Sequence, residues 1–216
     1  MRTYRHFLSG FSLFVLFAFH AFAQDSITFT WKGGVNKQID VNSAGATVFW
    51  GDGSTTNTVS ATMQHTYADT NGYTVSIVAN VPYIMGFRCS GNQVSSLDVS
   101  KAPSLVYLDC FYNQLSHLDV SENPNLRDLL CFGNKLSSLD LSKNTVFKVL
   151  ECQNNQLNSL ILGASVTLER LYCNNNQLLL SDLYAIGLKF HLGVKICTKE
   201  WDLRLYPHGK LLLKTR

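Results

Sequence analysis

The feature that most constrains the fold of this chain is a cysteine that recurs every 21 residues. An asparagine follows three residues after each cysteine, and an aliphatic residue follows two residues after the asparagine. The five cysteines are Cys89, Cys110, Cys131, Cys152 and Cys173, and their asparagines are Asn92, Asn113, Asn134, Asn155 and Asn176. A period held over five units predicts a solenoid, in which each repeat is one supersecondary element that stacks on its neighbours.

The unit reads L-x-x-L-x-C-x-x-N-x-L-x-x-L-D-V-S, followed by four variable residues. L-x-C places two side chains on one face of a short strand, because alternate residues of a strand point the same way. No single unit can bury that face, so we expect parallel stacking, with each asparagine binding backbone groups at the bend that follows its strand. A second apolar pair, such as Leu118 and Val120, fills the core from the opposite wall. That wall has room only for extended or short 3₁₀ segments.

The chain has six cysteines, which in an exported protein could form three disulfides. The 21-residue spacing instead stacks five of them in one inward column on parallel strands, about 4.8 Å apart. Parallel Cβ vectors do not supply the torsion of about 90° that a disulfide needs, so we predict buried, free thiols. Cys197 follows Cys173 by 24 residues and falls outside the column.

The sequence predicts no metal or cofactor site. It has no Cys-x-x-Cys pair, and its six histidines are scattered. Three aspartates also recur with the period, but each occupies the same turn of its repeat, two residues before a serine. Capping of backbone amides is therefore favoured over metal binding. The three are Asp98, Asp119 and Asp140.

Residues 1–23 have the features of a secretory signal peptide. Arg2 and Arg5 precede an apolar run over 11–22, which ends in Ala-Phe-Ala before Gln24. We expect the mature chain to be secreted or displayed on the cell surface. No later apolar run reaches the roughly 18 residues needed to span a membrane, so no transmembrane segment is predicted after removal of the signal.

The charge of the mature chain argues against nucleic acid as a partner. Without the two arginines of the signal, 16 basic and 15 acidic residues remain, a net charge of +1. Residues 24–188 carry −4 and residues 189–216 carry +5. A near-neutral body with a short basic tail has no basic stripe that would follow a phosphate backbone.

Residues 24–82 differ in composition from the repeats. They are rich in Thr, Val and Ser, and their apolar residues alternate, as at Phe29 and Trp31, which predicts a small antiparallel β-domain. Asp52 before a glycine favours a tight turn over a calcium ligand. No serine elbow, cysteine–histidine pair or spaced carboxylates support a catalytic role for His65.

Two resemblances rest on these motifs. The repeat resembles the bacterial leucine-rich repeat family, in the short-repeat style of internalins and other secreted surface proteins. The W-G-D-G run at 50–53, followed by H-T-Y at 65–67 and G-Y-T-V at 72–75, resembles the PKD family of immunoglobulin-like domains. They imply a mainly β protein, with a PKD-like β-sandwich over 24–82 in which His65 is a packing residue. A leucine-rich repeat solenoid follows over 83–180, with a parallel β-sheet on its concave face.

Residues 181–216 abandon the period. Ser181 could begin a short helix that covers the open end of the array, since repeat arrays need a terminal cap. We interpret this basic stretch as a C-terminal cap that is degenerate or incomplete.

The resemblances jointly imply an exported, non-enzymatic protein that binds a partner macromolecule through the concave face of its repeats, and we expect it to be a monomer. The alternative is an accessory module of a secreted glycan-degrading system that binds carbohydrate. Retention on insoluble polysaccharide would distinguish the glycan role from a partner-protein role.

The candidate binding residues come from columns that flank L-x-C and point away from the core. These columns vary freely while the core columns repeat, as a recognition surface and its scaffold would. The predicted ligand-binding residues are Tyr107, Asp109, Phe111, Tyr112, Asp128, Phe132, Glu151, Arg170 and Tyr172. The aromatic residues at 107, 111, 112 and 132 are predicted to form one exposed patch that is the binding centre. In the alternative interpretation, these rings pack against the PKD-like domain or against each other.

Overall fold

The computed structural model describes residues 24–58, 61–79, 83–163, 168–179, 195–197, 201–205 and 211–215. The regular elements in these ranges are β-strands, which confirms the mainly β fold class. Among the described residues there is no helix of the length and apolarity that crossing a membrane requires. The predicted signal peptide at 1–23 and the helix expected from Ser181 lie outside the described residues.

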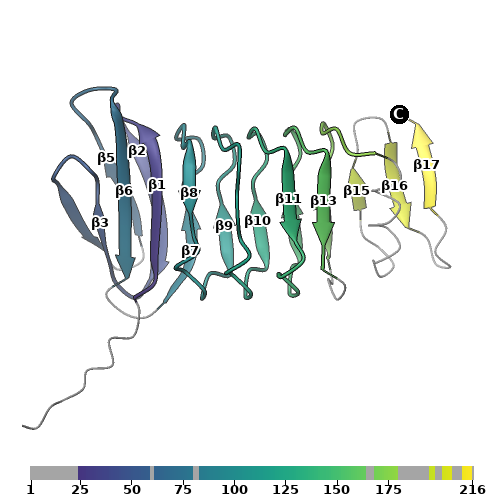
Figure 1. Cartoon of the computed structure of the whole chain (residues 1–216), viewed down its shortest axis with the longest axis horizontal. Coiled ribbons are helices and arrows are strands. Elements are labelled where there is room, and N and C mark those ends of the chain that lie inside the picture. The colour runs from purple at the N-terminus through teal and green to yellow at the C-terminus, as the bar shows by residue number, and fades with distance from the viewer. Residues whose placement is uncertain are drawn as a thin grey trace, which may run out of the picture.

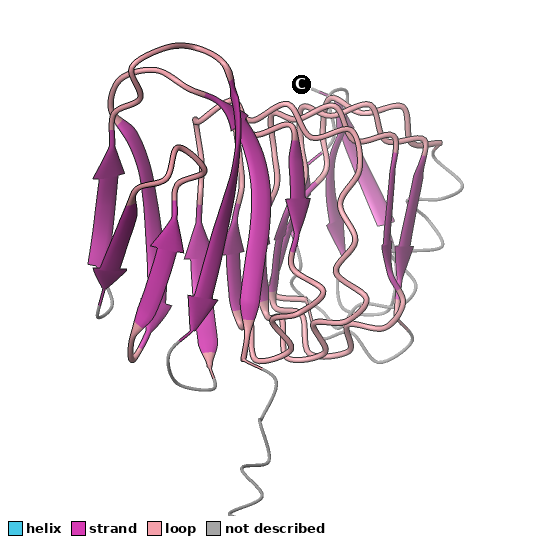
Figure 2. Cartoon of the chain, turned by 60° about the vertical axis from the view of Figure 1, so that its left-hand side comes forward, coloured by secondary structure: helices cyan, strands magenta, loops and turns pink. Residues whose placement is uncertain are grey.

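Six strands precede the repeats and form two facing layers (Figure 2). They are β1 (Ser26–Lys32), β2 (Lys37–Ser43), β3 (Ala46–Phe49), β4 (Thr55–Thr58), β5 (Ala61–His65) and β6 (Gly72–Ala79). One layer holds β4, β3, β6 and β1 in that order, and the other holds the antiparallel pair β2 and β5. Alternate residues of β1 and β6, such as Phe29 and Val75, are buried between the layers, as the apolar alternation predicted.

The repeats build a β-solenoid with two walls (Figure 1). One wall is a parallel sheet that contains β7 (Ile84–Arg88), β9 (Tyr107–Asp109), β10 (Asp128–Leu130), β12 (Val149–Glu151) and β14 (Arg170–Tyr172). Neighbouring strands pair residues 21 positions apart, so Leu108, Leu129 and Leu150 stack in one buried column. The second wall is extended, as the short period predicted, and carries β8 (Ser96–Asp98), β11 (Ser138–Leu141) and β13 (Ser159–Leu162).

The two layers of the N-terminal strands continue into the two walls of the solenoid. β2 pairs with β7 on one wall and β1 pairs with β8 on the other, both antiparallel. One hydrophobic core therefore runs from Ile27 to Cys173 without interruption. The composition changes near residue 82, where the repeats begin. Both sheets nevertheless include strands from before and after that residue.

The parallel wall also continues beyond the predicted repeats. β15 (Lys195–Cys197) pairs in parallel with β14, and β16 (Trp201–Leu205) and β17 (Leu211–Thr215) then add two antiparallel strands. The register aligns Cys197 with Tyr172, while Ile196 aligns with Leu171. Cys197 thus lies in register with the column of Tyr172, one position away from the cysteine column. The predicted loss of the 21-residue period is correct here, and yet the sheet persists through a step of 25 residues.

The five periodic cysteines are buried and form no disulfide, as predicted. Burial raises the pKa of the three thiols in the middle of the column, Cys110, Cys131 and Cys152, because the protein interior disfavours the charged thiolate. For Cys131 the pKa rises to about 12. In this column cysteine is a small apolar residue that fits between neighbouring turns.

The asparagines bind the bend after each strand, as predicted, and they also join adjacent repeats. Asn134 donates from Nδ2 to the carbonyl oxygens of Cys131 (3.0 Å) and of Cys110 in the preceding repeat (2.9 Å). Its Oδ1 accepts a hydrogen bond from the Leu115 amide (3.0 Å). Asn113, Asn155 and Asn176 make the same set of contacts. Each side chain satisfies buried backbone groups of two turns at once.

A second asparagine column, which the sequence reasoning missed, lies at the turns of the other wall. Asn123 and Asn144 are fully buried, and each donates to two carbonyl oxygens of the preceding repeat. Their 21-residue separation was the available signal, but two copies are a weak pattern. The recurring aspartates cap these turns as predicted: the Oδ1 atoms of Asp98, Asp119 and Asp140 accept hydrogen bonds from amides two residues on, at 2.8–2.9 Å.

The motif residues of the N-terminal strands have structural roles. Asp52 Oδ1 accepts hydrogen bonds from the Ser54 hydroxyl (2.6 Å) and amide (2.9 Å), as expected for a turn. These bonds, and after them His65, lower the pKa of Asp52 to about 2. The His65 ring stacks on Trp50 with the ring centroids 4.7 Å apart, so the prediction of a packing histidine is confirmed.

Candidate binding face

The residues predicted to bind a ligand lie on or beside the parallel wall, on its surface away from the core. We call this surface the outer face. It carries the alternate residues of β9, β10, β12 and β14 and the residues that follow these strands, and it extends across β7 onto β2 and β5. The antiparallel pairing of β2 with β7 places Asp40 beside Arg88 on this face.

Three aromatic rings form a cluster where β9 and β10 end. Phe111 and Phe132 lie on adjacent turns and stack in parallel, with centroids 4.5 Å apart and an interplanar angle of 10°. Tyr112 stands edge-on to both, at 5.5 Å from Phe111 and 5.1 Å from Phe132. The two phenylalanines are half-buried, while Tyr112 is 60% exposed. We call Phe111, Tyr112 and Phe132 the aromatic cluster.

Tyr112 has a left-handed backbone with φ of 50°. The same is true of every residue in its column, which reads Gly91, Tyr112, Gly133, Asn154 and Asn175. The prediction that this column varies freely is wrong, because glycine and asparagine are the residues that accept this conformation most readily. Tyr112 is the exception, since a bulky residue with positive φ is a genuine outlier.

The strained tyrosine is held by its neighbours. The ring of Tyr112 lies over Gly133 and occupies the space that a Cβ at that position would need. Gly133 therefore serves both its own left-handed backbone, with φ of 68°, and the packing of the tyrosine ring. Strained residues that the surrounding structure holds in place cluster at functional sites, which makes Tyr112 the strongest candidate on this face.

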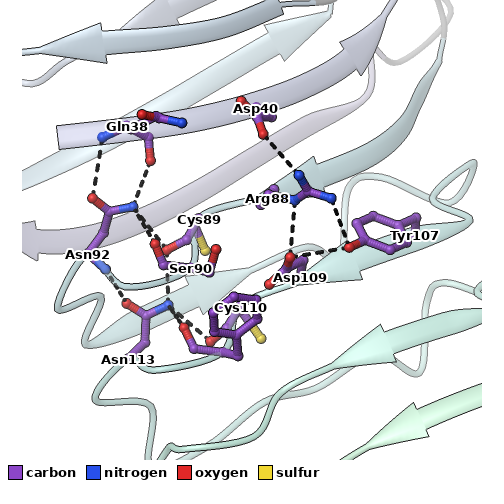
Figure 3. A network of polar contacts seen from close by, with 11 residues as sticks. Gln38, Asp40, Arg88, Cys89, Ser90, Asn92, Tyr107, Asp109, Cys110 and Asn113 are labelled. Atoms are coloured by element: carbon purple, nitrogen blue, oxygen red, sulfur yellow. Dashed lines mark hydrogen bonds and ion pairs between the residues drawn. The ribbon is translucent and has the colours of Figure 1, made fainter.

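Asp109 was predicted to be exposed, and this is wrong: its side chain is buried between Tyr107 and Arg88. Arg88 Nε lies 3.0 Å from Asp109 Oδ2, and Nη1 lies 3.4 Å from Asp40 Oδ2 on β2 (Figure 3). Burial raises the pKa of the Asp109 carboxyl, opposed by the hydrogen bond from Tyr107 and the charge of Arg88. Arg88 thus links this carboxylate to Asp40 of the N-terminal strands, and Asp109 does not face a ligand.

Tyr107 belongs to this polar network. Within the described part of the chain, its ring makes no contact with the rings of the aromatic cluster. Its hydroxyl accepts a hydrogen bond from Arg88 Nη2 (3.1 Å) and lies 3.2 Å from Asp109 Oδ2, to which it donates. The predicted patch of four rings therefore consists of three rings that pack together and one half-buried tyrosine beside Arg88. Packing of the rings against each other, one of the two alternatives, is thus part of the arrangement.

The remaining predicted residues flank the centre of the outer face. Asp128 and Tyr172 are half-buried, and Arg170 is exposed. Glu151 Oε1 lies 3.6 Å from Arg170 Nη1 across adjacent strands. Leu130, half-buried between Asp109 and Glu151 in the sheet register, completes an apolar centre that the predicted set did not include.

Sequence reasoning also missed the contribution of the N-terminal strands to this face. Asn92 of the first repeat binds β2 in place of a preceding repeat: its Nδ2 donates to the Gln38 carbonyl (2.6 Å), and its Oδ1 accepts from the Gln38 amide (3.3 Å; Figure 3). No periodic signal could identify Gln38 or Asp40, because β2 lies outside the repeats. Among the described residues, no group of three or more metal-ligating side chains occurs.

Comparison with known proteins finds similar solved structures but no matching family model and no match among curated proteins. The functional domain of InlJ from Listeria monocytogenes, described as including a cysteine ladder, is 30% identical to this chain with a TM-score of 0.46. That match covers 55% of this chain and 27% of the other. A leucine-rich repeat protein of Leptospira interrogans is 22% identical, with a TM-score of 0.38, over 49% of this chain and 35% of the other. This chain thus spans about a third or less of either protein.

Proposed function

We propose that this chain is an exported, non-enzymatic protein that binds a partner protein through its outer face, with the aromatic cluster as the binding centre. Tyr112 is the observation that carries the proposal. The backbone of its column favours glycine or asparagine, and Tyr112 is the residue of the column that carries a large side chain instead. Its aromatic ring is presented to solvent. Exposed aromatic residues dominate the energetics of protein interfaces.

The surroundings of the aromatic cluster support a protein partner. Leu130 and Val149 extend an apolar centre across β10 and β12, while the paired charges of Arg88 and Arg170 lie toward its two ends. An apolar centre with a polar rim is the usual anatomy of a protein interface. The asparagine columns already hold the underlying sheet in place, so binding of a partner would immobilise few additional groups.

The proposal includes the domain organisation inferred from the sequence. In it, residues 1–23 are a signal peptide, 24–82 a PKD-like unit, 83–180 internalin-like repeats and 181–216 a C-terminal cap. The mature protein is monomeric and is secreted or held at the cell surface. The two-layer N-terminal strands and the 21-residue solenoid are compatible with this organisation.

Site-specific photo-crosslinking tests the binding centre. A photoreactive phenylalanine analogue is placed at Tyr112 and, as a matched control, at Ile161, which is 48% exposed on the opposite wall. After incubation with extracts and surface fractions of the producing cells and of cells they contact, position 112 should yield discrete protein adducts and position 161 should not. Equal labelling at both positions, or adducts at neither, would contradict the proposal.

Tyr112→Asn provides the matching loss of function. Asparagine already occupies this column at Asn154 and Asn175 with φ near 55°, so the backbone conformation is kept. The variant should compete at least tenfold less well for the crosslinked partner, with a melting temperature equal to or above that of the parent protein. Unchanged competition would show that the exposed ring is not part of the interface.

A further inference from the structure

A cleft of about 370 Å³ lies on the wall opposite the outer face, where the N-terminal strands meet the first two repeats. Thr30 and Lys32 of β1 line it together with Thr74 of β6. The first repeat adds Gln93 and Ser95, and the second adds Gln114. β1 lies between β6 and β8 in the sheet (Figure 1). Both structural regions therefore contribute residues to the cleft. Its volume falls in the range of about 300–1,000 Å³ typical of small-molecule sites, which favour such junctions.

Two hydroxyl groups of the cleft, those of Thr30 and Ser95, are hydrogen-bonded to each other. Thr30 Oγ1 lies 2.9 Å from Ser95 Oγ and 2.6 Å from Ser96 Oγ, so the hydroxyls of Thr30, of Ser95 and of the first residue of β8 form one connected group. Thr74 lies directly opposite Thr30 in the register of β1 and β6. A hydroxyl both donates and accepts hydrogen bonds, which suits a ligand that is itself rich in hydroxyls.

Two glutamine amides are available at the rim. The side chains of Gln93 and Gln114 are exposed and make no hydrogen bond to another described residue. Gln93 also has a left-handed backbone with φ of 60°, unlike the described residues that follow the asparagine in the other repeats. Because of this strained backbone conformation, the side chain of Gln93 leaves the chain in a different direction from those of its counterparts. It does so at the cleft.

The charge of the cleft restricts the ligand further. None of the described side chains that line it carries a carboxylate, and Lys32 is its one cationic lining residue. The ammonium group of Lys32 forms no ion pair with another described residue. Together, amides, hydroxyls and a single cation suit a ligand with several hydroxyls and one anionic group.

We infer that this cleft binds an acidic saccharide, one or two sugar rings of a larger glycan, with the acidic group facing Lys32. The site is separate from the aromatic cluster and does not depend on the proposed function. It gives the chain a glycan contact on one wall and a protein contact on the other.

The test uses the mature full-length protein and an array of uronic-acid-containing oligosaccharides with their neutral counterparts. The wild-type protein should bind uronic-acid members at least tenfold more strongly than the neutral ones. Gln93→Gly combined with Gln114→Ala should reduce that binding at least tenfold, because glycine keeps the positive φ while the amide is lost. Lys32→Gln should remove the preference for acidic members.

Two controls separate this inference from a folding defect and from the proposed function. Gln156→Ala changes the equivalent exposed residue two repeats beyond Gln114, outside the cleft, and should bind as the wild type does. Tyr112→Asn should also leave glycan binding unchanged. Absence of binding to every oligosaccharide, equal binding by the cleft variants, or a preference for neutral members would each overturn the inference.

Discussion

The N-terminal strands and the repeats share two sheets and one core, but different contacts hold each region together. In the N-terminal strands the core is built from large rings that occur once: Trp31 stacks parallel to Trp50 at 6.2 Å and stands edge-on to Phe29 at 5.0 Å. In the repeats the core columns are mostly leucine, valine and cysteine, and the polar columns are buried asparagines. The strands differ too: β1 and β6 have seven and eight residues, whereas the repeat strands after β7 have three or four.

The difference follows from symmetry. In the solenoid every group has a copy about 4.8 Å away, so a contact that links one turn to the next can recur along the array. An asparagine that binds two turns at once suits this arrangement. The antiparallel N-terminal strands do not repeat by translation, so their buried polar groups each have their own hydrogen-bond partners. Tyr67, for example, donates to the Trp50 carbonyl (2.7 Å) and accepts from Trp31 Nε1 (3.0 Å).

The largest expected effect comes from Trp31→Ala. The side chain is 1% exposed, and the change removes both its ring contacts and the hydrogen bond to Tyr67. We expect a loss of about 3–5 kcal/mol in the free energy of unfolding, measured by denaturant titration. Phe49→Ala, at a ring that is 45% exposed on β3, is the control and should change little.

Trp31→Ala also tests whether the shared core makes the two regions one folding unit. The five buried thiols of the repeats report their own exposure, because they should react only when the solenoid opens. If the core is continuous, the thiols of the variant should be labelled faster than those of the parent protein, in step with the loss of tryptophan fluorescence. Unfolding of the N-terminal strands while the thiols stay protected would show two independent units.

Leu129→Ala is the corresponding change in the middle of the repeats. Leu129 is fully buried and stacks between Leu108 and Leu150, so its truncation should cost about 2–5 kcal/mol. Leu179→Ala, at a residue that is 65% exposed near the end of the described repeats, should cost far less. Similar losses at both positions would mean that the array is not stabilised by neighbouring turns as the register indicates.

Asn134→Ala removes one member of the polar column and should have a smaller effect. Three backbone groups of two repeats lose their partner, and leaving such groups unsatisfied costs about 1–3 kcal/mol. Asn125→Ala, at an exposed asparagine with one hydrogen bond of 3.2 Å to the Pro103 carbonyl, provides the comparison. Urea denaturation that gives equal midpoints for the two variants would contradict the role of the column.

The smallest effect should appear in the acid stability of the N-terminal strands. The hydrogen bonds from Ser54, and then His65, hold the pKa of Asp52 at about 2, below its ordinary value of about 4. A depressed pKa stabilises the folded state above the unfolded value, and this stabilisation is lost as the pH falls from about 4 to about 2. Asp52→Asn keeps the turn but removes the charge, so its melting temperature should fall less over this range. Parallel pH profiles for the two proteins would show that Asp52 does not contribute.

Much of the solenoid could be predicted from the sequence because its contacts are periodic. A residue 21 positions away is also the neighbour in space, so a pattern along the chain identifies a long-range contact. For this reason the buried thiols, the leucine columns, the turn aspartates and the role of Asn113 follow from spacing alone. The tight turn at Asp52 was equally local, since its partner Ser54 is two residues away.

The candidate site was predicted only in part, because its geometry depends on backbone conformation and on contacts outside the period. Spacing placed Phe111 and Phe132 on adjacent turns, where they stack. It could not show that the column of Tyr112 is left-handed, which turns an apparently free position into a constrained one. Nor could it show that Asp109 is buried, because its partner Arg88 also contacts Asp40 from a strand with no place in the repeat.

The sequence by itself therefore determined the stacking of the repeats, the residues that face their core and the type of strand in each region. Only the tertiary structure decided how the array begins and what its surfaces offer. β2 takes the place of a preceding repeat at Asn92, and the meeting of β1 with the first two repeats creates the cleft beside Lys32. The physical reason is that translation symmetry converts sequence distance into spatial distance inside the repeats. At the junction that symmetry ends, and contacts such as Gln38 with Asn92 join residues 54 positions apart.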